Sequence, residues 1–271
     1  MYACFLSRTF RSTQSIRNYI SGIKTWHKLL NFDTSSFQDI ELKLTLQGLD
    51  KTMAHLPHPG LPILPHHLSA IKHRLDLSSP FDATIWASII VSFFAFLRKS
   101  NLVPPSISSF NPREQLCRSD FRFVQQGLLI QIQWSKSRQH HDHMHVIPVS
   151  ALPQSELCPL WAYCHMLALQ PASASSPAFS VIRSGHLVPL TQHVLRQHFR
   201  RLVSDIGLNP VDYSFHSLRR GGATVAAMAG IPDSLIRTQG DWRSMVYKDY
   251  ISIPATERFH VTAAMGDLMI S

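Results

Sequence analysis

The sequence of 271 residues predicts a mainly α protein with a small antiparallel β-sheet, the α+β class. Three observations lead to this prediction. Apolar residues recur at three- and four-residue steps in most segments, as on the buried face of a helix. Two β-prone stretches flank the turn residues 125–127, which is typical of a hairpin. A proline-rich segment at residues 56–65 separates a short from a long part of the chain.

In the short N-terminal part, the sequence pattern predicts two helices. In residues 12–30 an apolar stripe runs from Ile16 to Leu30, and Ser12 is one of several candidate N-caps. A second helix is expected over residues 36–53, although Gly48 weakens its later half. The prolines that follow forbid a continuous helix and favour an extended tether, so we place a domain boundary there.

In the long C-terminal part, we expect one small sheet with helices before it and after it in the sequence. Two helices, over residues 66–75 and 80–97, precede the sheet. Its strands are expected at residues 121–123, 128–134 and 144–149. The helices that follow are expected over 158–169, 190–206, 217–229, 232–239 and 242–250. Residues 171–177 are predicted to be a flexible connection, and Gly230 is predicted to end a helix.

The most apolar run covers residues 81–97 and contains Asp82. A helix that spans a bilayer needs about 20 apolar residues, so this run falls short. We therefore expect a buried core helix and no membrane partner.

Charge and composition favour a polyanionic partner. The formal net charge is +9, the isoelectric point is about 9.7, and sixteen histidines are not counted in that charge. Each phosphate that a basic protein neutralises releases condensed counterions, which favours binding to nucleic acid. A merely basic protein with no such partner is the alternative. With 45% hydrophobic and 16% charged residues, the chain is expected to be globular rather than disordered.

The four cysteines lie far apart, at Cys4, Cys117, Cys158 and Cys164. No two of them form a CxxC pair, so neither a disulfide framework nor a zinc knuckle is suggested. We expect reduced and mostly buried thiols in an intracellular protein.

Two C-terminal motifs suggest phosphoryl chemistry. His216 and Arg219 stand three residues apart, so on a helix they share one face and can converge on a small anion. Arginine forks bind phosphate especially well. The later motif 240–250 ends in Tyr250, and a tyrosine held near the anion could attack it. The pair of motifs therefore points to a nucleic-acid backbone as the substrate.

From about residue 64 to the end, these motifs in this order resemble the catalytic domain of the tyrosine recombinases, also called the phage integrase family. The resemblance is greatest to the recombinases of eukaryotic mobile elements. It implies a catalytic domain over 64–271 and a partial helical core-binding (SAM-like) DNA-binding domain over 1–57. That domain has about four helices in the family, and the first is expected to be missing here. The implied function is a site-specific DNA recombinase or integrase with a 3′-phosphotyrosyl intermediate.

The resemblance assigns two arginines to the scissile phosphate. Arg98 follows an apolar helix, as the family's first arginine does, and Arg219 completes a clamp for the transition-state charge. An ordinary helix C-terminal cation is the alternative for Arg98. Arg220 is the competitor of Arg219, but it lies about 100° further round the helix. The family often has an acidic residue where Asn101 stands, so the usual carboxylate support of the site is in question.

The resemblance assigns the proton transfers and the remaining phosphate contact to three residues. Lys136, in the predicted hairpin, is the general acid that protonates the leaving 5′ oxygen, and a solvated hairpin lysine is the alternative. His216 donates a hydrogen bond or exchanges a proton with the nucleophile. Trp242 stands where many members have a second histidine, and its indole N–H can donate to phosphate. A core tryptophan is the alternative for Trp242.

Tyr250 is the nucleophile by this resemblance, and Tyr247 is its competitor one helical turn earlier. A free phenol has a pKa of about 10, so it needs help from the arginines or from a base. Because the covalent link conserves the phosphodiester energy, the reaction needs no ATP, metal or other cofactor.

A histidine-rich segment, 140–145, has the composition of a metal site, and His141, His143 and His145 would share one face of a strand. Nothing else in the chain resembles a metal-site pattern, so we predict no metal and prefer a solvated hairpin loop near DNA. His193, Arg196, Arg200 and Arg201 share one helical stretch that contacts phosphates or forms a solvated face.

The resemblance implies double-stranded DNA as partner and a homotetramer on DNA. Residues 256–271 are the candidate segment that joins the protomers. The expected location is the nucleus if the host is eukaryotic, and otherwise the cytoplasm. Two alternatives stay open: a catalytically inactive, element-derived DNA-binding protein, and a type IB topoisomerase, which shares the chemistry.

Overall fold

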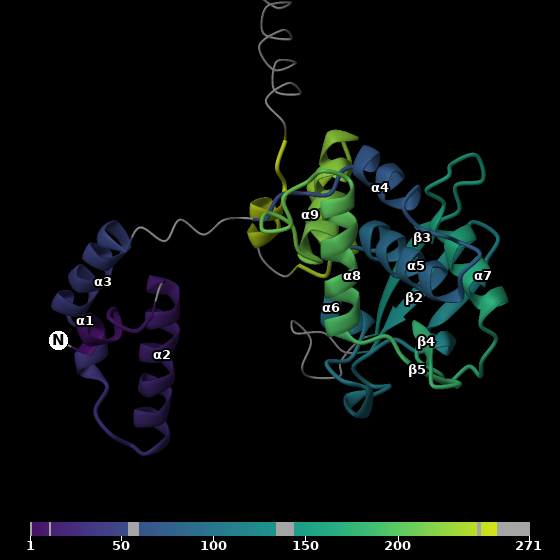
Figure 1. Cartoon of the computed structure of the whole chain (residues 1–271). Coiled ribbons are helices and arrows are strands. Elements are labelled where there is room, and N and C mark those ends of the chain that lie inside the picture. The colour runs from purple at the N-terminus through teal and green to yellow at the C-terminus, as the bar shows by residue number, and fades with distance from the viewer. Residues whose placement is uncertain (1, 11, 54–59, 134–143, 243–244, 254–271) are drawn as a thin grey trace, which may run out of the picture. The chain divides into compact units, whose positions relative to one another are not determined.

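The computed structural model describes residues 2–10, 12–53, 60–133, 144–242 and 245–253. The chain divides into two compact units, residues 1–58 and 59–271, and the division falls inside the proline-rich segment. Figure 1 shows the elements of both units with their labels.

The first unit is a small helical unit with a short apolar core. Its buried core consists of Ala3, Leu6, Ile16 and Leu46. The predicted helix at 12–30 is confirmed, and the Ser12 hydroxyl caps it by accepting from the Ser15 amide at 3.2 Å. The elements are α1 (Tyr2–Leu6), α2 (Thr13–Leu29), the 3₁₀ turn η1 (Ser35–Gln38) and α3 (Ile40–Thr52).

Two features of this unit differ from the sequence prediction. Helix α1 was not predicted, because its five residues are too few to show a period. The predicted helix at 36–53 is interrupted at Asp39, where a ψ of 142° takes the backbone out of the helical region. The first turn is therefore a separate 3₁₀ turn, and α3 begins only at Ile40.

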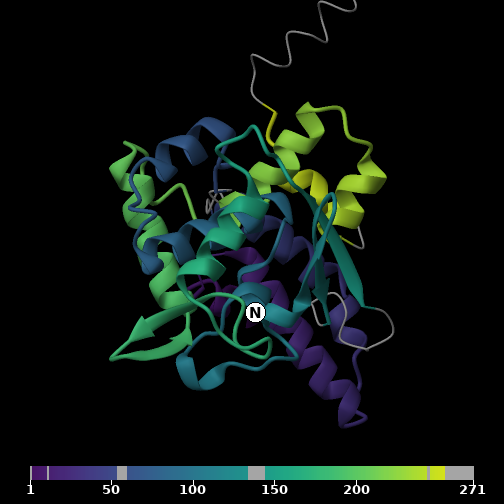
Figure 2. The ribbon, with the colours of Figure 1, turned by 90° about the vertical axis from the view of Figure 1, so that its right-hand side faces the viewer.

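The second unit is built of helices around small antiparallel sheets. Figure 2 shows its C-terminal helices, in yellow-green and yellow, gathered at one end and a green hairpin at the opposite end. The helices are α4 (Pro65–Lys72), α5 (Pro80–Phe94), α6 (Lys99–Leu102), α7 (Pro159–Leu169), α8 (Gln192–Asp205), α9 (His216–Met228) and α10 (Asp233–Gln239). The 3₁₀ turns are η2 (Ile107–Ser109), η3 (Arg118–Asp120) and η4 (Met245–Tyr250).

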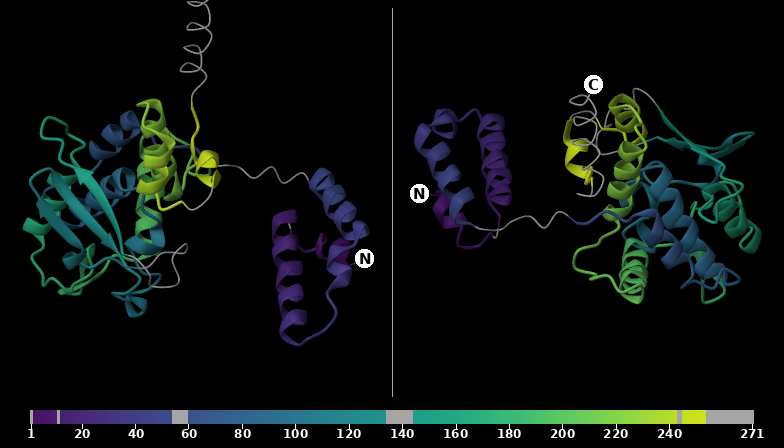
Figure 3. Two further views of the ribbon diagram at one scale, coloured as in Figure 1. Left: turned by 180° about the vertical axis from the view of Figure 1, so that it is seen from behind. Right: turned by 90° about the horizontal axis from the view of Figure 1, so that it is seen from above.

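The predicted antiparallel sheet is confirmed. It contains β1 (Phe121–Val124), β2 (Gly127–Ile132) and β3 (His145–Ser150) in the order β1-β2-β3. Phe121, Ile130 and Ile147 lie opposite one another across the three strands, and all three are buried. The left view of Figure 3 shows this sheet as teal arrows.

A second sheet corrects the expectation of a single one. Strands β4 (Ser180–Arg183) and β5 (His186–Pro189) pair in an antiparallel hairpin. Ser184 and Gly185 form its turn with φ angles of 50° and 77°, as a two-residue hairpin turn requires. The strands have four residues each, which is too few for a recognisable alternation.

Helix α5 is the central core element, as predicted. Eleven of its fifteen residues, from Ala83 to Phe93, are buried. It ends at Phe94 rather than Leu97, because Phe96 adopts a left-handed φ of 48°. Among the described residues no helix is long and apolar enough to cross a membrane.

Helix α9 packs very closely against the segment before α4 and the end of α5. A Cβ atom at Gly221 would lie 1.8 Å from the Ile63 carbonyl oxygen, and one at Gly222 would lie 2.2 Å from the Phe93 carbonyl oxygen. Neither position tolerates a side chain, so both must be glycine for the helix to pack this closely. The close packing fixes the residues at the start of α9.

All four cysteines are free thiols. Cys117 and Cys158 are buried, but Cys4 and Cys164 are exposed. The expectation of mostly buried thiols is therefore correct for two of the four.

Candidate active site

Three segments that lie far apart in sequence meet at one end of the second unit. They are the junction between α5 and α6, the first turns of α9, and the segment from Gly240 to Tyr250. This is the end where Figure 2 shows α9, α10 and η4 together. Five of the six predicted site residues lie here: Arg98, His216, Arg219, Trp242 and Tyr250.

Arg219, in the first turns of α9, contacts both of the other segments. Its side chain is among the largest that are fully buried, and the residue is 2% exposed. The guanidinium donates to the Phe96 carbonyl oxygen and, at 2.6 Å, to the Gly240 carbonyl oxygen. Phe96, with its left-handed backbone, lies two residues before Arg98, so the same junction carries an acceptor of Arg219 and Arg98 itself. Arg219 therefore holds the α5–α6 junction and the Gly240 turn against α9.

Arg98 is the more accessible of the two arginines, with 22% of its side chain exposed. One terminal nitrogen lies 3.4 Å from the Asp241 carboxylate, and the other donates to the Asp241 carbonyl oxygen at 3.3 Å. Arg98 and Arg219 thus contact adjacent residues, Asp241 and Gly240. The two guanidinium groups are close enough for their charges to interact.

Burial, and next the charge of Arg98, lower the pKa of Arg219 to about 9. Tyr250 and Asp241 act in the opposite direction. Arg219 is therefore still a cation at neutral pH. Two like charges held together in a partly dry site favour an anion between or beside them.

Trp242 belongs to a small apolar cluster and also faces Arg219. It is 8% exposed and packs with Phe96 and Tyr247. The Arg219 guanidinium carbon lies 3.9 Å from the centre of the indole ring, which is a cation–π contact. A Cβ atom at Gly240 would lie 1.8 Å from that ring, so glycine is required there. The tryptophan thus packs in the core, as one of the two interpretations proposed, and supports Arg219.

His216, the first residue of α9, contacts the predicted nucleophile. Its Nε2 atom lies 2.7 Å from the Tyr250 hydroxyl oxygen. Burial of the ring, and next the charges of Arg219, Arg220 and Arg98, lower the pKa of His216 to about 4. The imidazole is therefore neutral at pH 7, although the residue as a whole is exposed. A neutral ring can accept the phenol proton through Nε2.

The two candidate tyrosines occupy different environments. Tyr247 is 0% exposed and lies against Trp242, with ring centres 6.2 Å apart. Burial, and next the Asp233 carboxylate, raise the pKa of Tyr247. Tyr250 is partly exposed, and its ring lies 5.7 Å from the Arg219 guanidinium carbon. Of the two, Tyr250 is the one whose hydroxyl lies beside His216.

The structure does not test every predicted site residue. Lys136 and residues 140–143 lie outside the described residues, as does the candidate docking segment 256–271. His145 is described and lies in β3, where it is buried. Within the described ranges, no group of three or more metal-binding side chains occurs.

Sequence reasoning missed one charged residue of the site. Asp241 is buried, and its φ of 51° lies in the left-handed region that aspartate tolerates better than most residues. The signal was a polar residue directly after Gly240. Its contact with Arg98 brings a carboxylate to the site although Asn101 lacks one.

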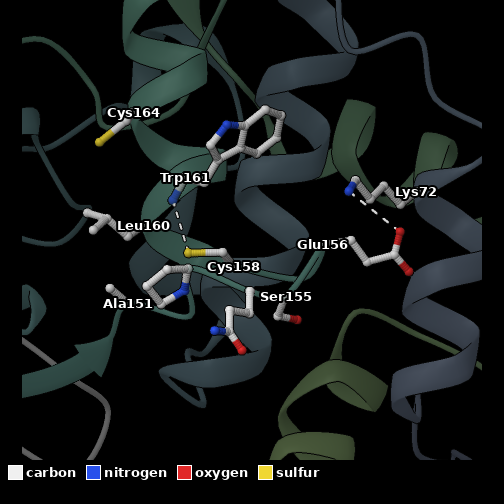
Figure 4. A pocket seen from close by; sticks show the side chains of 10 residues that line it. Lys72, Ala151, Ser155, Glu156, Cys158, Leu160, Trp161 and Cys164 are labelled. Carbon is white, nitrogen blue, oxygen red and sulfur yellow. Dashed lines mark hydrogen bonds and ion pairs between the residues drawn. The ribbon is translucent and has the colours of Figure 1, made fainter.

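A cavity of about 620 Å³ lies elsewhere in the second unit, beside the start of α7 (Figure 4). Lys72 and Glu156 form an ion pair of 3.6 Å at its edge, and the exposed Trp161 forms part of its wall. None of its lining residues belongs to the cluster around Arg219. We therefore do not place the chemistry there.

Helix α8 presents a basic face to solvent. His193, Arg196, Arg200 and Arg201 are all exposed, and Leu195, Phe199 and Leu202 on the other side are buried. Arg201 also lies 3.9 Å from the carboxylate of Asp205.

Solved structures of DNA recombinases have the same fold. The Tn1549 transposon integrase in complex with transposon right-end DNA matches with a TM-score of 0.67 at 13% identity, over 100% of this chain and 84% of that one. The XerA recombinase matches with a TM-score of 0.51 at 16% identity, over 97% of this chain and 80% of its own.

The XerH site-specific recombinase, bound to its palindromic difH substrate in a post-cleavage complex, has a TM-score of 0.54 and 17% identity. That match covers 76% of this chain and 52% of XerH, so the chain spans about half of the XerH length. No protein-family model matches the sequence, and no curated protein matches it either. The chain has the α+β fold of the tyrosine recombinases.

Proposed function

We propose that this chain is a site-specific DNA recombinase or integrase that cuts and rejoins DNA through Tyr250. The observation that carries the proposal is the hydrogen bond of 2.7 Å between the Tyr250 hydroxyl and His216, directly beside Arg219. A phenol, a neutral base and two cations are the groups that phosphoryl transfer to tyrosine requires. The similar solved structures include recombinases bound to DNA, which supports the same substrate class here.

In the proposed first step the Tyr250 oxygen attacks the scissile phosphorus while the bond to the 5′ oxygen breaks. The phenol proton passes to His216 Nε2, which is neutral at pH 7 because its pKa is about 4. Lys136 supplies the proton to the leaving 5′ oxygen, and a 3′-phosphotyrosyl link results. A 5′ hydroxyl of another strand then reverses the step, and the released phenol recovers its proton.

The two arginines have different parts in this proposal. Arg98 is exposed enough to bind the phosphate directly, and its contacts with Asp241 orient the guanidinium for that role. Arg219 contributes its positive charge from a buried position, and it keeps Trp242 and the Gly240 turn in place. Charge stabilisation by Arg219 is stronger than in open water because this residue and Trp242 are buried.

The remaining parts of the proposal concern the partners. Residues 1–57 act as a partial core-binding domain, and the basic face of α8 contacts phosphates of double-stranded DNA. The enzyme acts as a homotetramer on DNA and needs no cofactor. It works in the nucleus of a eukaryotic host or otherwise in the cytoplasm, and it resembles the recombinases of eukaryotic mobile elements.

One observation favours a second candidate, a catalytically inactive DNA-binding protein. Arg219 is 2% exposed, and its terminal nitrogens already donate to two backbone carbonyls. If Arg219 cannot release either acceptor, its contribution to the transition state is limited to charge at a distance. Binding of DNA without cleavage would then remain.

Trapping of a covalent complex separates the two candidates. The intact protein is incubated with a pool of nicked duplexes of randomised sequence, in which cleavage releases a short strand that cannot religate. We expect a protein–DNA adduct that survives denaturation, lost in Tyr250→Phe and kept in Tyr247→Phe. A type IB topoisomerase would also relax a supercoiled plasmid without a paired site. DNA binding with no adduct in the intact protein would favour the inactive candidate.

A further inference from the structure

One face of α9 contacts the chain around Tyr250 at three successive positions. His216, Arg220 and Thr224 are four residues apart, so they form one row along the helix. His216 reaches the Tyr250 hydroxyl, and the other two reach the backbone next to it. The row therefore contacts Tyr250 both at its hydroxyl and along its backbone.

Thr224 contacts the backbone on the C-terminal side. It is 0% exposed, and its hydroxyl donates to the Tyr250 carbonyl oxygen at 3.4 Å. The Thr224 hydroxyl oxygen also accepts from the Ser252 amide at 3.0 Å. A hydroxyl has one donor and two acceptor positions, so both bonds form together without competition.

Arg220 contacts the backbone on the N-terminal side. Its guanidinium donates to the Asp249 carbonyl oxygen, and its central carbon lies 5.4 Å from the centre of the Tyr250 ring. The last carbonyls of a helical turn have no partner within that turn, and an arginine can satisfy them. The end of η4 is held in this way from α9.

We propose that Arg220 and Thr224 are positioning residues that latch the backbone of Tyr250 onto α9, so that the phenol meets His216. This inference rests on the proposed function of Tyr250 as nucleophile. A phenol has only two side-chain torsions, so a fixed backbone on both sides largely fixes the oxygen. Misplacement of a reacting atom by about 1 Å can slow a reaction about 100-fold. The latch uses backbone groups, so it does not depend on the side chains of Asp249 or Ser252.

The test of the latch uses a substitution that removes only the hydroxyl. Thr224→Val keeps the shape of the side chain, and Thr224→Ser keeps both hydrogen bonds. Thr238→Val is the matched control, because the Thr238 hydroxyl bonds the Ser234 carbonyl within α10 at 2.8 Å. Arg220→Met tests the other contact, with Arg113→Met as the control at an exposed arginine. Melting temperatures identify any variant that is not folded.

The first measurement is the amide hydrogen exchange of Ser252, by NMR on the full chain without DNA. Loss of one hydrogen bond should speed this exchange about tenfold in Thr224→Val. Thr224→Ser and Thr238→Val should match the unmodified protein. Equal exchange in Thr224→Val and the unmodified protein would overturn the latch.

The second measurement is the single-turnover rate of covalent capture on the nicked duplexes at saturating DNA. Thr224→Val and Arg220→Met should each be slower by about tenfold, with DNA affinity changed less than about twofold. Faster exchange with an unchanged capture rate would overturn the positioning role. If the unmodified protein captures no DNA, the proposed function fails, and the exchange result alone then decides whether the latch exists.

Discussion

The two units of this chain differ in how firmly their side chains are fixed. The first unit buries four apolar residues and leaves Trp26 and Leu29 60% and 79% exposed. In the second unit the side chains of the candidate site hold one another: Arg219 is 2% exposed and has two backbone acceptors. Catalysis requires reacting groups in fixed positions, whereas binding to a charged backbone tolerates movement. On the proposed function, we therefore expect the chemistry in the second unit and only a contribution to affinity from the first.

Replacement of Arg219 should give the largest effect. Arg219→Ala leaves two buried carbonyl oxygens without a donor, so we expect a loss of about 2–4 kcal/mol in the free energy of unfolding. Capture of DNA should fall about 1000-fold, because the positive charge beside the phosphate is lost and the Gly240 turn is released. Denaturant unfolding and single-turnover capture measure the two effects.

The matched change in the first unit is Arg17→Ala, which removes an exposed ion pair of 2.6 Å with Asp50. It should cost at most about 1 kcal/mol and leave saturated capture unchanged. If the alanine variant does not fold, Arg219→Lys is measured in its place. It keeps the positive charge but loses the two-pronged donor geometry of the guanidinium. Similar losses in Arg17→Ala and Arg219→Ala would contradict the distinction between the units.

Asp241→Asn should have an intermediate effect. It removes the negative charge that lies 3.4 Å from the Arg98 guanidinium while keeping the size of the side chain. We expect capture about tenfold slower, because one charge-assisted hydrogen bond that orients Arg98 is weakened. Asp233→Asn, whose carboxylate pairs with Lys248 at 3.7 Å, is the control. Equal rates in the Asp241 and Asp233 variants would remove Asp241 from the site.

In the first unit, Trp26→Ala should weaken DNA binding by about threefold to tenfold, as expected if the exposed ring contacts a base or sugar. The capture rate at saturating DNA should not change. Titration of DNA binding and the saturated rate are measured on the same variant. A lower saturated rate with normal affinity would show that the first unit takes part in the chemistry.

The smallest expected effect concerns pH and stability. The pKa of His216 is lowered from 6.5 to about 4, so between these values the unfolded chain binds a proton that the folded chain does not. Stability from this group is complete above pH 6.5 and decreases as the pH falls towards 4. The melting temperature of the unmodified protein should therefore fall relative to His216→Gln over this range. Because the residue is partly exposed, a difference of a few degrees is expected. A constant difference across the range would contradict the lowered pKa.

Much of the site could be predicted from the order of its motifs. A buried helix before Arg98, the pair His216 and Arg219, and a late tyrosine were enough to predict which segments meet. The hairpin β1–β2 and helix α5 were also predictable, since their periods and turn residues are clear in the sequence.

The parts that could not be predicted depend on contacts between distant segments. Asp241 reaches Arg98 only because its backbone is left-handed, and no local pattern shows that conformation. Arg220 lies off the face that was assigned to phosphate, and its acceptor is 29 residues away. Four-residue strands such as β4 and β5 are too short for a period.

The most direct test of the central claim is to map the covalent link by mass spectrometry. Trypsin cleaves after Lys248, so the two candidate tyrosines fall in separate peptides, Ser244–Lys248 and Asp249–Arg258. The protein is trapped on the nicked duplexes, digested with nuclease and trypsin, and searched for a nucleotide adduct. We predict the adduct on Tyr250 in the second peptide. An adduct on Tyr247, or on any residue of the first unit, would contradict the account.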